Sequence, residues 1–110
     1  MTSVVPTLPA LLAGTVRAHP DRTALRQGAA SLTYARLDDR TARAAALLRG
    51  HGLREGDRVA VALPNVLQFP VVYYAALRTG AVVVPLNPLL TAGELEFALR
   101  DSGARLLVAA

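Results

Sequence analysis

The fold of this chain is decided by residues 58–88, which read RVAVALPNVLQFPVVYYAALRTGAVVVPLNP. Two runs of consecutive apolar residues, 59–63 and 81–84, lack the alternation of a half-exposed strand, and this is typical of strands covered on both faces of a parallel sheet. Between them, Pro64-Asn65 signals a turn and a helix start, all of residues 66–77 except Gln68 and Pro70 are apolar, and Gly80 ends the helix. We therefore predict a strand, a buried helix from about Val66 and a parallel strand, with helices above and below the sheet.

The segment before residue 58 predicts two helices and a hairpin. Thr7 is suited to cap a first amphipathic helix, which His19-Pro20 stops. Residues 23–26 and 31–33 have the pattern of a small hairpin beside the main sheet. A longer helix is expected over residues 34–49, and the residues expected along its buried face are Leu37, Thr41, Ala44 and Leu48.

The segment after residue 88 predicts one more helix and one more strand. Thr91 and Glu94 have the spacing of a capping box, and the helix that they begin should run to about Ser102. Residues 105–109 start a third apolar strand, which would leave the chain truncated within a strand near Ala110. Since such crossovers are right-handed and parallel, the expected fold class is α/β, a parallel sheet with helices on both faces. No composition shift divides residues 1–110, so they form one structural unit.

Composition limits the possible partners. Twelve arginines, no lysine and eight acidic residues give a formal net charge of +4, which raises the question of nucleic-acid binding. Only Arg36, Arg40 and Arg43 share a helical face, Asp39 is placed to pair with Arg43, and no aromatic residues interleave with these charges. We predict no nucleic-acid partner. Hydrophobic residues make up 53%, against about 45–50% in an ordinary globular domain, so part of the apolar surface is expected to have a neighbour.

No residue qualifies as a catalytic, cofactor-binding or metal-binding residue. The absence of cysteine excludes thiolate chemistry and disulfides. Neighbouring carboxylates at Asp38 and Asp39 point about 100 degrees apart on a helix and are interpreted as a solvated face. His19 and His51 are interpreted as helix-terminus residues, and the glycines never form a phosphate-loop spacing. Residues 59–77 carry no charge, but their prolines, asparagine and glutamine argue against a transmembrane segment.

A family resemblance rests on several short motifs in register. They are HPDRTAL at 19–25, LTYARL at 32–37, GDRVA at 56–60, LPN at 63–65, LRTGAVVVPLNP at 77–88 and DSGAR at 101–105. In this order and at this spacing they resemble the start of the adenylate-forming, AMP-binding superfamily. Asn87-Pro88 and the segment FPVVY at 69–73 are similar to fatty acyl-CoA synthetases, whereas peptide-synthetase adenylation domains more often have Asp-Pro. Arg36 and Gly93 depart from the family pattern and weaken only local helix starts.

The resemblance implies what the parent protein does. Residues 1–110 would be a partial N-terminal domain of an AMP-dependent synthetase or ligase of fatty acid metabolism. Such an enzyme joins a carboxylate to ATP as an acyl-adenylate and then transfers the acyl group to coenzyme A, with Mg²⁺ as the metal. The family's phosphate loop, metal-binding glutamate, ribose-binding aspartate and C-terminal lysine lie in later motifs, so no catalytic, cofactor or metal residue is transferred to this chain. The implied enzyme is cytoplasmic, either free or bound peripherally at a membrane.

Three interpretations stay open on the sequence. The chain is part of an ATP-dependent acyl-CoA ligase, part of an adenylation module that loads a carrier protein, or a stand-alone fragment without catalysis. In the first, its partners are the remainder of the parent polypeptide and a small carboxylate such as a fatty acid. The isolated 110 residues are expected to be inactive. They are also expected to self-associate, because an open sheet edge and an uncovered apolar helix favour association.

Overall fold

The computed structural model describes residues 7–64 and 67–109. Its elements, in chain order, are α1 (Leu8–Ala18), β1 (Thr23–Gln27), β2 (Ala30–Thr33), α2 (Tyr34–Gly50), β3 (Arg58–Ala62), α3 (Gln68–Arg78), β4 (Val82–Pro85), α4 (Ala92–Ser102) and β5 (Leu106–Ala109). Every predicted helix and strand is present. The predicted start of the buried helix at Val66 lies outside the described residues.

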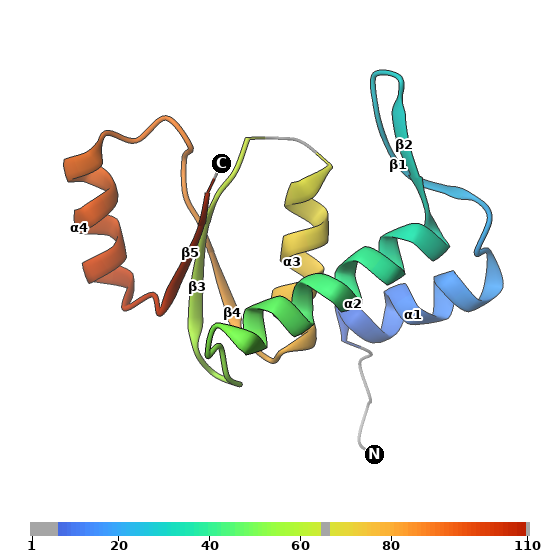
Figure 1. The fold of residues 1–110 in the computed structure, drawn as a ribbon, viewed down its shortest axis with the longest axis horizontal. Coiled ribbons are helices and arrows are strands. Elements are labelled where there is room, and N and C mark those ends of the chain that lie inside the picture. The colour runs from blue at the N-terminus through green and yellow to red at the C-terminus, as the bar shows by residue number, and fades with distance from the viewer. Residues whose placement is uncertain (1–6, 65–66, 110) are drawn as a thin grey trace, which may run out of the picture.

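Two sheets organise these elements. β1 and β2 form the predicted antiparallel hairpin, and the main sheet has the order β4-β3-β5 with all pairs parallel. Figure 1 views the main sheet close to edge-on, with α2 and α3 on one side of it and α4 on the other. The hairpin lies away from the main sheet, beside the start of α2, and α1 packs against both α2 and α3. The predicted α/β class with parallel crossovers is confirmed.

The hydrophobic core lies between the main sheet and the pair α2 and α3. Val59 and Val61 of β3 are fully buried there and meet Ala75 and Ala76 of α3, which are fully buried as well. Because alanine side chains are short, they allow α3 to pack close to the strand at the density of a protein interior. The remaining buried members of this cluster are Ala45, Leu48, Leu53 and Ala81.

The opposite face of the sheet is only partly covered. α4 lies on that side but has no buried residue. Val82 of β4 is 50% exposed and Leu107 of β5 is 38% exposed, although Ala60 of the central strand is fully buried. The radius of gyration, 15.1 Å, exceeds the value of about 13 Å expected for a compact domain of this length. Helices therefore flank both faces, as predicted, but the two edge strands are not covered on the side of α4.

Two details of the helices differ from the sequence-based expectation. On α2 the fully buried alanine is Ala45, one position beyond the predicted Ala44, which is only half-buried. On α3 only Ala75 and Ala76 are buried, whereas the aromatic and branched residues before them are half-buried. The predicted burial of α3 is therefore complete at Ala75 and Ala76 and partial at its other residues, of which Gln68 alone is exposed. Its apolar first two turns keep part of their surface exposed.

The caps predicted at Thr7 and at Thr91 with Glu94 are confirmed, and Thr33 caps α2. The side-chain oxygens of Thr7 and Thr33 accept hydrogen bonds from backbone N–H groups of α1 and α2. At α4, Thr91 accepts from the Glu94 N–H at 3.2 Å and the Glu94 carboxylate accepts from the Thr91 N–H at 3.0 Å, which completes the capping box. These bonds stabilise the carboxylate form and hold the pKa of Glu94 below its ordinary value of 4.5.

Removing the Thr91 hydroxyl from this capping box should weaken α4 and relieve part of the depression of the Glu94 pKa. Thr91→Ala is expected to lower the free energy of unfolding at neutral pH by about 0.5–2 kcal/mol, because an orphan N–H loses its partner. A carboxylate whose pKa is depressed by folding stabilises the fold above its unfolded pKa, and this contribution disappears as the pH falls through the folded pKa. Alanine keeps the Thr91 N–H that donates to the carboxylate and removes only the hydroxyl, so an NMR titration should show the Glu94 pKa rising part of the way toward 4.5 in the variant. An unchanged pKa would mean that the Thr91 hydroxyl does not contribute to the shift.

Candidate functional site

The carboxyl ends of β3 and β4 are the first place to look for a site. Ligands of open parallel sheets bind in the crevice outside the carboxyl ends of the strands. The described residues that follow these two strands, 63–64 and 86–91, include no acidic, basic or histidine side chain. Asn87 is polar, but its Oδ1 already accepts a hydrogen bond from the Leu89 N–H at 2.9 Å within the turn. The described loops at this edge thus supply backbone groups and apolar side chains.

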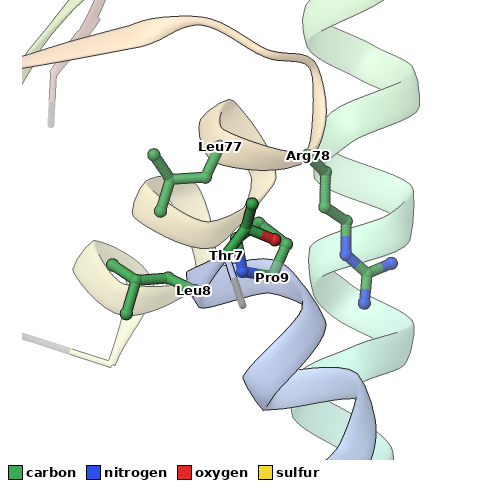
Figure 2. Close-up of a pocket in the computed structure, with 5 residues that line it drawn as sticks. All are labelled: Thr7, Leu8, Pro9, Leu77 and Arg78. Carbon is green, nitrogen blue, oxygen red and sulfur yellow. The ribbon is translucent and has the colours of Figure 1, made fainter. Parts of the chain in front are cut away.

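A hollow of about 530 Å³ lies between the start of α1 and the end of α3. Thr7, Leu8, Pro9, Leu77 and Arg78 line it (Figure 2). The Thr7 hydroxyl accepts from the Ala10 N–H at 3.3 Å, so this oxygen is already used by the helix cap. Figure 2 shows the Arg78 guanidinium directed toward α2, away from Leu8 and Leu77. The lining combines apolar surface with polar groups that already have partners, and it presents no nucleophile or acid.

Arg78 connects two helices of the core. Its guanidinium forms an ion pair and hydrogen bond with the Asp38 carboxylate of α2, and both side chains are partly buried. The Arg78 carbonyl accepts from Nη2 of Arg49 at 3.2 Å, which adds a second connection between α3 and α2. Asp38 was interpreted as part of a solvated face; its side chain is 39% exposed, but it also forms this ion pair, which the interpretation did not include. Asp39 does match it, because it lies exposed and pairs with Arg43 at 3.1 Å.

Several arginines bind backbone carbonyls of the chain itself. The Arg58 guanidinium donates to the Ser102 carbonyl at 2.6 Å and so holds the end of α4 near the start of β3. Arg105 donates to the Gly52 carbonyl at 3.1 Å and lies 3.6 Å from the Asp57 carboxylate. Asp57 in turn accepts from the Arg54 N–H at 2.8 Å. The Arg105 contacts join the loop after α2 to the loop before β5, and the side chains of Arg58 and Arg105 therefore have a structural role.

The remaining titratable residues do not gather into a site in the part of the chain that the structure describes. No three histidine or acidic side chains there lie close enough together to hold a metal ion. His19 and His51 are the C-caps of α1 and α2, which confirms their interpretation as helix-terminus residues. None of the described helices combines the length and the apolar character that crossing a bilayer requires.

The pair Arg78–Asp38 was not predicted from the sequence. Its members are 40 positions apart, whereas the pairs that a sequence reveals are neighbours on one helix, such as Asp39 and Arg43. A charged residue at the end of an otherwise uncharged helix was the only available signal. It indicates that Arg78 lies where the apolar segment ends, but it does not identify the residue with which Arg78 pairs.

Comparison with known proteins defines the family. Residues 12–110 match the AMP-binding enzyme family, so the chain belongs to it. The long-chain-fatty-acid–CoA ligase of Haemophilus influenzae is 45% identical over 94 residues, which cover 84% of this chain and 17% of the ligase. Feruloyl-CoA synthase of an Amycolatopsis species is 48% identical over 92 residues, which cover 84% of this chain and 19% of the synthase.

Solved structures agree with this assignment. The inhibitor-bound N-terminal domain of FACL13 from Mycobacterium tuberculosis is 32% identical and superposes with a TM-score of 0.89, over 96% of this chain and 27% of that domain. The chain therefore spans less than a fifth of the curated relatives it matches and about a quarter of this solved domain. Both curated relatives named here are coenzyme A ligases or synthases, and this favours the acyl-CoA branch over a module that loads a carrier protein.

Proposed function

We propose that this chain is the N-terminal part of an ATP-dependent, AMP-forming acyl-CoA ligase. The observation that carries the proposal is the 45% identity with a long-chain-fatty-acid–CoA ligase over 84% of the chain. The parallel β4-β3-β5 sheet and the TM-score of 0.89 with an N-terminal domain support it. The substrate of the parent enzyme would be a fatty or related carboxylic acid, and its location would be cytoplasmic.

ATP, Mg²⁺ and coenzyme A are the reactants and metal that this proposal implies for the parent. The residues present here do not fit them. The sequence contains no lysine to pair with a phosphate, and the described acidic residues form no group that could hold a metal ion. We therefore assign no catalytic, cofactor or metal residue to residues 1–110 and derive no reaction step from them.

The role left for this segment is structural support. β3 and β4 are parallel and end at the same edge of the sheet. The buried contacts of Val59 and Val61 with α3 hold β3 in a fixed position relative to that helix. A site assembled beyond the carboxyl ends of these strands needs that edge to be rigid, because misplacement by about 1 Å can cost about a hundredfold in rate.

An assay of acyl-CoA formation tests the proposal. The native polypeptide that carries this sequence is expected to release AMP and form a thioester when given ATP, Mg²⁺, coenzyme A and a long-chain fatty acid. The 110-residue polypeptide should show no carboxylate-dependent exchange of pyrophosphate into ATP. Transfer of the acyl group to a carrier protein in place of coenzyme A would contradict the ligase assignment. Exchange catalysed by the 110 residues alone would contradict the supporting role.

A further inference from the structure

Among the helices that the structure describes, α3 is the one that lacks a side-chain cap of its own. Threonine side chains cap α1, α2 and α4, whereas the N-cap position of α3 is occupied by Leu67, which has no acceptor to offer. The first N–H groups of a helix find no partner within the helix itself. An acceptor from another segment would therefore stabilise the start of α3.

Gln27, the last residue of β1, supplies this acceptor from 40 positions away. Its Oε1 accepts a long hydrogen bond, 3.4 Å, from the Leu67 N–H. Because a backbone N–H can only donate, the oxygen and not the nitrogen of the Gln27 amide faces α3. This bond ties the hairpin to the start of a helix that belongs to the main sheet.

The other end of the hairpin is fixed to α2. β2 runs directly into α2, and Figure 1 shows the hairpin rising from the start of that helix, with its turn at the end away from α2. The Tyr34 N–H donates to the Arg22 carbonyl at 3.0 Å. The Ala35 N–H donates to the Pro20 carbonyl at 2.9 Å. Since its base is held in this way, the hairpin can hold the start of α3 in place relative to α2.

The start of α3 lies at the edge of the main sheet where β3 ends, and ligands of such sheets bind outside that edge. We propose that Gln27 is a positioning residue for the ligase reaction. Through its bond to Leu67 it holds the start of α3, and the carboxyl end of β3 beside it, in the position that the site requires. The role in the reaction rests on the proposed function, whereas the anchoring of α3 rests on the hydrogen bond alone.

Gln27→Leu in the native polypeptide tests the proposal, because leucine has a similar size and removes the acceptor. The Leu67 amide should exchange with deuterium about three- to tenfold faster, as measured by mass spectrometry at residue resolution. The kcat of acyl-CoA formation should fall about tenfold, since small misplacements near a site are costly. Gln27→Glu retains an oxygen acceptor, and its negative charge suits a helix start, so kcat should stay within about twofold of the unaltered enzyme.

Gln68→Leu is the matched control. It makes the same change beside Leu67, at an exposed side chain that forms no hydrogen bond within the described chain, and it should alter neither the exchange rate nor kcat. Unchanged exchange at Leu67 in Gln27→Leu would overturn the proposal.

Two further results would overturn the positioning role. One is faster exchange at Leu67 with an unchanged kcat. The other is an equal loss of kcat in Gln27→Leu and Gln27→Glu, because the loss would then not depend on the acceptor. A native polypeptide that forms no thioester would contradict the ligase assignment, and the exchange rate at Leu67 would still decide whether Gln27 anchors α3.

Discussion

Leu53→Ala is expected to lower the free energy of unfolding by about 2–5 kcal/mol, the range found when a buried leucine is truncated and a cavity remains. Leu53 is fully buried and belongs to the core cluster between the sheet and α2 and α3. Its N–H donates to the Leu48 carbonyl at 3.1 Å, which fixes the backbone and limits collapse around the cavity. Since small domains have total stabilities of about 5–15 kcal/mol, this single change would remove a large share.

Urea unfolding at one low protein concentration measures this effect. Leu89→Ala removes the same atoms from a side chain that is 87% exposed, and it should change the free energy by less than about 0.5 kcal/mol. Comparable losses in the two variants would mean that Leu53 is not a core residue in solution.

Gly80→Ala is expected to destabilise the chain by about 1–3 kcal/mol through backbone strain, with a steric cost in addition. Gly80 follows α3 with φ of 78°, a region that disfavours residues with a Cβ atom. A Cβ added there would lie 2.8 Å from Cγ of Glu55. The Gly80 carbonyl also accepts from the Gly56 N–H at 3.0 Å, so the loop before β3 cannot move away without losing this bond.

Gly93→Ala is expected to stabilise the chain when it is measured in the same assay. Gly93 lies in the first turn of α4, and a Cβ added there meets no heavy atom within 4 Å. Because glycine is a poor helix residue, this variant should gain about 0.5–1 kcal/mol in the free energy of unfolding. If both glycine variants lost stability equally, the conformational explanation at Gly80 would be wrong.

The order of the elements could be predicted because each one carries a local signal. Consecutive apolar residues marked β3, the spacing of Thr91 and Glu94 marked the start of α4, and Gly80 marked the end of α3. Caps and turns depend on residues within a few positions of each other, so a single sequence displays them completely.

Contacts between distant segments could not be predicted in the same way. Leu53 lies in the short connection between α2 and β3, where no periodic pattern indicates burial. It is nevertheless fully buried. The Arg78–Asp38 pair depends on how α2 and α3 cross. The partial exposure of Val82 and Leu107 was also not visible, because an apolar run predicts that both faces of a strand are covered and does not say which chain covers them.

The intact mass of the native polypeptide that carries this sequence tests the central claim most directly. We predict a mass several times 11.6 kDa, since the aligned residues make up only 17% of the Haemophilus influenzae ligase. That result would identify residues 1–110 as the supporting sheet of a ligase whose catalytic residues lie elsewhere in the polypeptide. A native mass near 11.6 kDa would contradict the claim, because the sequence has no lysine and the described residues offer no metal site with which to activate a carboxylate.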